Sequence, residues 1–400
     1  MRAALFICVA TPSVYEVHRY TGAPGVAVYL AACAAGCWVV SPALLSGWSD
    51  RRAWWMAGAT FAALALLFAV VYPIANSGGL TGGSDSDDSV NIAVREMLHG
   101  RYPYYVRTYL DNAVHEMPGM LLLATPFVLL GNSAYQSLFW LPAFFLTAAS
   151  ALTGPKPALL LLWVLLVLCP SVVHQLVTGG NSITSGIAPL VFCWWLKERA
   201  STRASRTMAA AGLGLAVATR LNFVLLVPLA VVALVRRRGL SRAVEDGVVL
   251  ALVFLAVTLP FYLFDPAGFM PLEGMSRATR FDTVLPAGGS LYIAGGVMVT
   301  ALAAWRVRSF EAGAALVQGF FVIAGIAFLS LGSNRLRLDY GGYGLFFAFF
   351  GAFACWQYLV THTVQVPHAR ARAAVLPPAP GDVPHDQTVP FRYAVTRDDE

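Results

Sequence analysis

The sequence has little charge. Only 12% of its 400 residues are Asp, Glu, Lys or Arg, 58% are hydrophobic, and the mean hydropathy is +0.65. Soluble domains carry about 25% charged residues. The shortage of charge extends along the chain to about residue 361, which excludes a soluble enzyme with one membrane anchor. Each helical crossing of a bilayer needs about 20 apolar residues, and such runs recur over this whole length.

Lysine and cysteine are scarce as well. The only lysines are Lys156 and Lys197, so arginine carries almost all of the positive charge behind the net value of +6, a bias that suggests a GC-rich bacterial genome. These basic residues lie in short loops between apolar runs, as in cytoplasmic loops of membrane proteins, which argues against nucleic-acid binding. The cysteines lack metal-ligand spacing, and we interpret them as small buried apolar side chains; they are Cys8, Cys33, Cys37, Cys169, Cys193 and Cys355.

The apolar runs predict an all-α polytopic membrane protein with about 11 or 12 transmembrane helices. Residues 4–17 form an incomplete additional run, and the interruptions at Pro12 and Glu16 argue against a cleavable signal peptide. The main candidate spans are 24–46, 53–74, 134–152, 157–176, 181–196, 208–219, 221–235, 248–264, 290–305, 312–331 and 340–361.

Basic loops orient these spans, because cytoplasmic loops are enriched in Lys and Arg. The chain is expected to lie in a bacterial plasma membrane, with residues 1–361 as one transmembrane domain and 362–400 as a disordered cytoplasmic tail. The expected cytoplasmic loops contain Arg51 and Arg52, residues 197–206, residues 236–242, and Arg306 with Arg308; the expected outer loops are 75–116, 265–289 and 332–339.

Segment 117–131 is the weakest of the apolar runs. An odd number of crossings must separate loop 75–116 from the basic loop at 197, yet four apolar segments lie between them. Pro118 and Pro126 interrupt this one. We therefore expect 117–131 to be re-entrant or interfacial; the alternative is a short true span.

Arg220 interrupts the apolar stretch 208–235, both ends of which are basic. The simplest arrangement is two short helices that meet at the outer face, with Arg220 and Asn222 at the turn. A charged side chain at membrane depth usually marks a site. The alternative is an arginine that reaches the outer headgroups.

The outer loop 75–116 contains three carboxylates, Asp85, Asp87 and Asp88, before an amphipathic helix over 87–99 that Gly100 ends. Such a helix can lie on the outer membrane surface with its apolar side down. The pattern from Ser84 to Asp87 also fits a capping box, and a carboxylate that caps a helix is a weaker base. One cap accounts for one or two carboxylates but hardly for three, so a catalytic role for at least one is favoured.

This order of motifs resembles the GT-C glycosyltransferases, above all the polyprenol-phosphate-mannose-dependent mannosyltransferases and their arabinofuranosyltransferase relatives. The resemblance covers most of residues 53–361. It is carried by the acidic motif, Leu98-x-Gly100, Pro103-Tyr104, Met117-Pro118-Gly119, Gly180-Asn181, and Ala211-Gly212-x-Gly214-Leu215-Ala216 followed by Arg220. Many relatives have lysine where this chain has Arg220, and the acidic cluster fits the family register in more than one way.

The resemblance implies inverting transfer of a sugar, mannose first and a pentose second, from a polyprenyl-phosphate donor to a hydroxyl of a glycan or glycolipid at the outer face. Asp87 is favoured as the general base, with Asp88 next and Asp85 third. Arg220 is the first choice for the phosphate. Further candidates for substrate binding are His174, Asn181, Arg280, Arg335, Arg337 and Tyr340. Whether Asp87 and Asp88 hold a divalent cation stays open.

Two other classes of protein compete with this interpretation. A transporter or flippase of an anionic lipid or solute would use Arg220 near the midplane, but such folds show internal repeats, and we find none. A membrane scaffold would leave the acidic cluster and Arg220 without a role.

Overall fold

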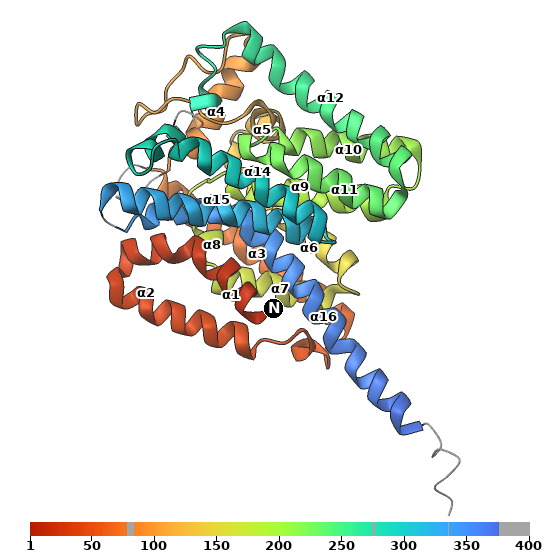
Figure 1. The fold of residues 1–400 in the computed structure, drawn as a ribbon. Helices are drawn as coiled ribbons and strands as arrows, with labels where there is room; N and C mark the ends of the chain where they lie inside the picture. Colours follow the sequence, from red (N-terminus) through yellow and green to blue (C-terminus); the bar gives the residue numbers. More distant parts are fainter. Residues whose placement is uncertain (78–83, 274–276, 335, 376–400) are drawn as a thin grey trace, which may run out of the picture. The chain divides into compact units, whose positions relative to one another are not determined.

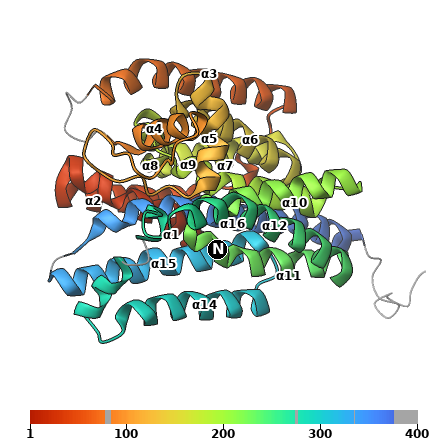
Figure 2. The same ribbon diagram turned by 90° about the horizontal axis from the view of Figure 1, so that it is seen from above.

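The computed structural model describes residues 1–77, 84–273, 277–334 and 336–375, with the side chains of 363–375 left aside. All regular elements in these ranges are helices (Figure 1), which confirms an all-α polytopic protein. Met1–Val360 form one unit and Thr361–Glu400 a second. Within the first unit, α3 (Asp50–Ala75) and α14 (Gly288–Arg306) lie at opposite edges (Figure 2).

Every apolar run expected to span is helical, but not every helix is long. Among the described residues, six helical segments have the length and hydropathy to cross a bilayer, and a bent pair makes up to seven. The segments are Arg2–Val39, Asp50–Ala75 (α3), Leu240–Phe264 (α12), Gly288–Arg306 (α14), Phe310–Ser333 (α15) and Leu338–His362, which includes the start of α16 (Leu345–Val375). Four runs form shorter helices, namely α6 (Gln136–Ala151), α9 (Ser182–Trp194), α10 (Arg203–Val217) and α11 (Leu226–Arg238).

The N-terminal segment is a hairpin of helices, where the sequence predicted an incomplete run over 4–17 and a span over 24–46. Helix α1 (Arg2–Ala10) leads into α2 (Val14–Val39), and α2 is broken at Gly22, whose φ of 68° suits a residue without a Cβ. Arg2 Nη1 donates to the carbonyl of Cys37 at 3.1 Å. The part of α2 after Gly22 therefore runs back towards the start of α1, so that Cys37 lies beside Arg2.

The run 157–176 is a broken helix. Helices α7 (Pro155–Leu168) and α8 (Pro170–Val177) meet at an angle of 79°. Pro170 has no amide hydrogen for the helical ladder, which explains the break. The carbonyl of Leu168 instead accepts a hydrogen bond of 2.8 Å from Tyr29 Oη.

Helices α9, α10, α11 and α12 connect two ends of the molecule. We call the end with α4 (Ser86–Leu98) and Arg220 the acidic end, and the end with loops 197–202, 236–240 and 306–309 the basic end. A helix of 13 residues is about 20 Å long, so the two ends are separated by at least that distance. Close packing keeps these helices together: a Cβ at Gly214 of α10 would lie 2.5 Å from the carbonyl oxygen of Leu250 in α12.

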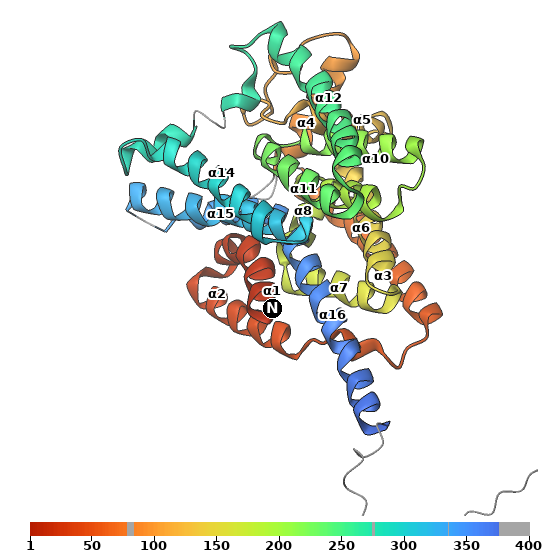
Figure 3. The same cartoon turned by 45° about the vertical axis from the view of Figure 1, so that its right-hand side comes forward.

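Helix α5 (Pro118–Leu129) is too short to cross a bilayer, since its 12 residues extend about 18 Å. It packs against α4, α10 and α12 (Figure 3). Residues on both sides of it contact α4: Glu116 accepts a hydrogen bond from Ser89, and Asn132 accepts one from Asn91. The chain therefore enters and leaves α5 at the acidic end.

The apolar stripe of α4 differs in its surroundings from the sequence-based expectation. Val90, Ala93 and Val94 are fully buried, and they pack with α5 residues such as Met120 and Leu121. Most of the stripe is therefore covered by α5 and not by lipid, while Met97 is partly buried and Leu98 at its end is 50% exposed. Helix α16 continues to Val375, beyond the expected start of the tail at 362, and residues 376–400 lie outside the described residues.

Candidate functional site

Asp87 is a buried carboxylate in the first turn of α4, only 2% exposed. Its Oδ2 accepts a short hydrogen bond from Tyr72 Oη of α3 and a second, of 3.4 Å, from Asn76 Nδ2. Its Oδ1 accepts no hydrogen bond from the described residues. One oxygen of this carboxylate is thus held in place, and the other keeps its capacity to accept a proton.

The neighbouring carboxylates have different partners. Asp85 Oδ2 accepts hydrogen bonds from Thr108 Oγ1 at 2.6 Å and Asn112 Nδ2 at 2.7 Å, which fixes the loop after α4. Asp88 Oδ2 accepts one from the backbone N–H of Tyr109 at 3.2 Å. The alternative capping box from Ser84 to Asp87 is not formed, since Ser84 Oγ accepts a hydrogen bond from the N–H of Ser86 at 3.2 Å and the helix begins after Asp85. Of the three, Asp87 is the one directed into the protein.

A polar cluster surrounds the Tyr72–Asp87 pair. Asn132, just after α5, donates to Tyr72 Oη at 2.7 Å, and Asn91 of α4 donates to Asn132 Oδ1 at 3.1 Å. Because Asn132 donates to Tyr72 Oη, the hydroxyl hydrogen of Tyr72 is directed towards Asp87. The sequence analysis did not single out Tyr72 or Asn132 as site residues.

Glu116 links α4 to Arg220. Its carboxylate accepts hydrogen bonds from Ser89 Oγ at 2.6 Å and from Asn181 Nδ2 at 3.0 Å. Asn181 Oδ1 in turn accepts a short hydrogen bond from Arg220 Nη2. Ser89 is two residues after Asp87, so the structure brings the acidic helix, Asn181 and Arg220 into one cluster. Glu116 was missed, although its place directly before Met117-Pro118-Gly119 in an apolar context was a usable signal.

Arg220 lies between α10 and α11, as the interrupted run predicts, and is half-buried. Its guanidinium lies 5.0 Å from the centre of the Phe346 ring, and Nε donates to Ser185 Oγ at 3.4 Å. No carboxylate within the described residues forms a direct ion pair with it. Its hydrogen bonds to neutral groups leave the positive charge available to an anion.

Two glycines permit this assembly. Gly179 has a φ of 71°, and a Cβ there would lie 2.8 Å from Asp87 Cγ. A Cβ at Gly119 would lie 2.4 Å from the carbonyl oxygen of Leu215, and the Gly119 N–H donates to the carbonyl of Ala218 at 3.0 Å. Gly179 lets the Asp87 side chain approach the segment that carries Asn181, and Gly119 lets the start of α5 approach the backbone just before Arg220.

Burial raises the pKa of the Asp87 carboxyl above its ordinary value, while the hydrogen bond from Tyr72 acts in the opposite direction. A carboxyl with a raised pKa binds a proton more readily than an exposed aspartate does, which suits a general base. The acidic end therefore carries a proton acceptor, Asp87, and a cation, Arg220, on two neighbouring hydrogen-bond networks.

The remaining predicted residues are not drawn into this cluster. His174 Nε2 lies 3.5 Å from Tyr20 Oη, Arg280 is exposed, and the Tyr340 ring lies 5.0 Å from the Tyr343 ring at a tilt of 46°. Arg337 forms a two-pronged ion pair with Asp339, with bonds of 2.8 and 2.6 Å, so its charge is already compensated. Arg335 lies outside the described residues.

The described residues contain no group of three or more His, Cys, Asp or Glu side chains placed to share a metal ion. All six cysteines are buried and free, as expected. No protein-family model, curated protein or solved structure matches this chain. The resemblance to GT-C glycosyltransferases therefore rests on the sequence motifs alone.

Proposed function

We propose that this protein is a membrane glycosyltransferase that moves a sugar from a polyprenyl-phosphate donor to a hydroxyl of a glycan or glycolipid. Mannose is the first choice of sugar and a pentose the second, as the motif resemblance implies. The observation that carries the proposal is that two hydrogen-bond networks meet at α4: Tyr72 holds Asp87, and Ser89 binds Glu116, which leads through Asn181 to Arg220.

Asp87 is the general base in this proposal. Its unpartnered Oδ1 takes the proton of the acceptor hydroxyl as that oxygen forms a bond to the anomeric carbon. Tyr72 holds Oδ2 and so orients the carboxylate. The bond between the anomeric carbon and the phosphate oxygen breaks on the opposite face, which inverts the configuration.

Arg220 stabilises the leaving polyprenyl phosphate. Negative charge grows on the phosphate oxygen as the bond breaks, and a guanidinium already fixed in position stabilises it without reorganising. Asn181 and Ser185 orient Arg220, and Glu116 orients Asn181. Because Asp87 is only 2% exposed, the side chains around it must move when the acceptor binds.

The orientation of the protein in the membrane is part of the same proposal. We place the acidic end outside the bacterial plasma membrane and the basic end in the cytoplasm, since the basic loops lie at one end. The short helices α6, α9, α10 and α11 would then cross together with the bent pair α7–α8 and with α3, α12, α14, α15 and α16, to give ten crossings after the N-terminal hairpin.

The test is transfer of a radiolabelled sugar from a polyprenyl-phosphate donor, in membranes at matched expression. Asp87→Asn should lower turnover by about 10²–10⁴-fold while donor binding survives. Arg220→Ala should weaken both donor binding and rate, and Arg220→Lys should restore part of each. Asp111→Asn is the matched control, because Asp111 is an exposed aspartate. Full transfer by Asp87→Asn would refute the assignment of the base.

A transporter or flippase of an anionic lipid is the second candidate. The 79° break between α7 and α8 supports it, because transporters bind substrates at discontinuous helices. The two functions separate in one experiment: a transporter moves the labelled polyprenyl-phosphate sugar across vesicles without forming a glycosidic product, and Asp87→Asn should not abolish that movement.

A further inference from the structure

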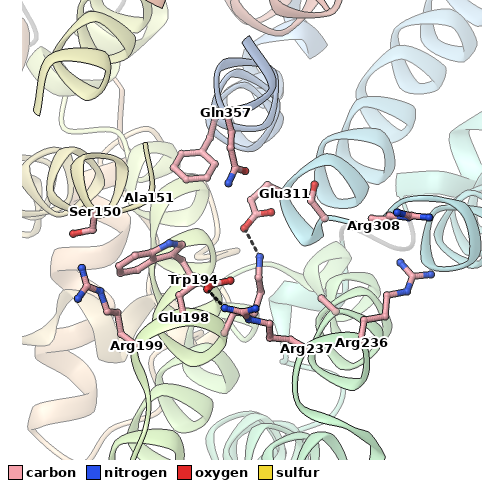
Figure 4. Close-up of a pocket in the computed structure, with 14 residues that line it drawn as sticks. Ser150, Ala151, Trp194, Glu198, Arg199, Arg236, Arg237, Arg308, Glu311 and Gln357 are labelled. Carbon is pink, nitrogen blue, oxygen red and sulfur yellow. Dashed lines mark hydrogen bonds and ion pairs between the residues drawn. The ribbon is translucent and has the colours of Figure 1, made fainter. Parts of the chain in front are cut away.

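A cavity of about 680 Å³ opens at the basic end of the molecule, beyond the far ends of the helices that begin near Asn181 and Arg220. Figure 4 shows its walls, which come from α6, the end of α9, α11, the start of α15 and α16. Cavities of about 300–1,000 Å³ hold small organic ligands. This one therefore has room for a molecule larger than a single ion.

The lining of the cavity is strongly basic. Its cationic side chains are Lys197, Arg199, Arg236, Arg237 and Arg308, and its carboxylates are Glu198 and Glu311. Membrane insertion by itself enriches cytoplasmic loops in Lys and Arg. It does not require these charges to line one cavity. Convergence of like charges costs free energy unless an anion compensates it.

Three of the five cations are held by protein groups. Lys197 pairs with the buried Glu311 at 3.1 Å, and Arg237 pairs with Glu198 at 2.8 Å. Arg236 donates to backbone carbonyls at the end of α14, including that of Ala304 at 2.9 Å. These contacts hold the three cationic side chains in place, and both carboxylates of the lining are used in ion pairs.

Arg199 and Arg308 have no acidic partner among the described residues. Both are exposed, and Arg199 lies 5.6 Å from the ring centre of Trp194, which limits its freedom. An adjoining cavity of about 330 Å³ shares Glu198 and Arg199 and adds Arg238, Arg242 and Arg206. Arg206 is paired with Glu245 and Asp246. The uncompensated charge of the larger cavity therefore lies on Arg199 and Arg308.

We propose that this basic cavity binds a phosphate-bearing molecule, either the headgroup of an anionic phospholipid or a soluble organic phosphate. Guanidinium groups match phosphate oxygens in planar, two-pronged hydrogen bonds. The apolar parts of Trp194, Ala151 and Phe353 in the same lining suit the carbon portion of such a molecule. The site is distinct from Asp87 and Arg220 and does not rest on the proposed glycosyl transfer.

The test compares two charge-matched double variants of the full-length, purified protein. Arg199→Gln with Arg308→Gln removes the two uncompensated charges of the cavity. Arg51→Gln with Arg203→Gln is the control, because both arginines are exposed, have no acidic partner among the described residues and do not line the cavity. None of the four substitutions breaks an ion pair, so folding should be preserved.

Binding of phosphatidylglycerol, against phosphatidylcholine as reference, is measured by native mass spectrometry, and binding of glycerol phosphate by the shift of the thermal unfolding midpoint. The cavity variant should bind the phosphate probe about tenfold or more weakly, since each lost charged hydrogen bond is worth about that factor. The control should bind like wild type. Loss with phosphatidylglycerol alone assigns a lipid, and loss with glycerol phosphate assigns a soluble ligand. Equal weakening in both double variants, or no preference for phosphate, would overturn the proposal.

Discussion

Glu116 should contribute substantially to stability at the acidic end. It is 9% exposed and accepts hydrogen bonds from Ser89 and Asn181. A hydrogen bond to a charged group contributes about 1.5–3 kcal/mol. Glu116→Ala removes both bonds and leaves Asn181 Nδ2 buried without its acceptor, so the free energy of unfolding should fall by about 3–6 kcal/mol.

Glu116→Gln should be much milder. Arg220 donates to Asn181 Oδ1, so the Asn181 amide nitrogen must face position 116. Glutamine can still present its carbonyl oxygen there and donate its amide to Ser89 Oγ, whose hydroxyl can rotate. Both bonds persist in neutral form, which is about half as strong, and the expected loss is about 1–3 kcal/mol.

The assay is unfolding of the purified protein in mixed micelles, followed by circular dichroism as the denaturing detergent increases. Glu96→Ala is the control, because Glu96 of α4 also lies at the acidic end but its carboxylate pairs only with the exposed Arg101; this substitution should change stability little. The reasoning fails if Glu116→Ala is as stable as wild type, or if Glu116→Gln is as damaging as Glu116→Ala.

Three further predictions follow from single features. Gly119→Ala should destabilise the fold by about 1–3 kcal/mol, since its Cβ would collide with the backbone of α10. Gly58→Ala in α3 is the control, because its Cβ meets open space and should not destabilise the fold. The measurement is a comparison of the unfolding curves of the two variants. Burial raises the Asp87 pKa, so transfer should be lost as pH falls through that raised pKa, at a higher pH than for an exposed aspartate; an acid limb of kcat/KM in the ordinary Asp range would contradict this. Deleting residues 376–400, which are rich in polar residues and proline, should leave transfer and unfolding unchanged.

The sequence by itself determined where most helices lie, because hydrophobic runs and helix-ending residues act locally. The amphipathic pattern predicts a helix over 87–99, and α4 extends over Ser86–Leu98. The interruption at Arg220 predicts two short helices, and α10 and α11 flank it. The length of an apolar run is also a local property of the sequence. The run 117–131 is too short and too interrupted to predict a full span, and α5 is only 12 residues long.

Only the tertiary structure decided which polar residues meet. The motif resemblance ranks Asp87 before Asp88 and Asp85, but the physical difference between them is the contact of Asp87 with Tyr72 on another helix. Glu116 reaches Asn181 across 65 positions of the chain, and Asn181 reaches Arg220 across 39. Such partners depend on how helices pack, and packing at Gly119 and Gly179 is set by surfaces far apart in the chain. The same reason explains why α5, and not lipid, covers most of the apolar stripe of α4.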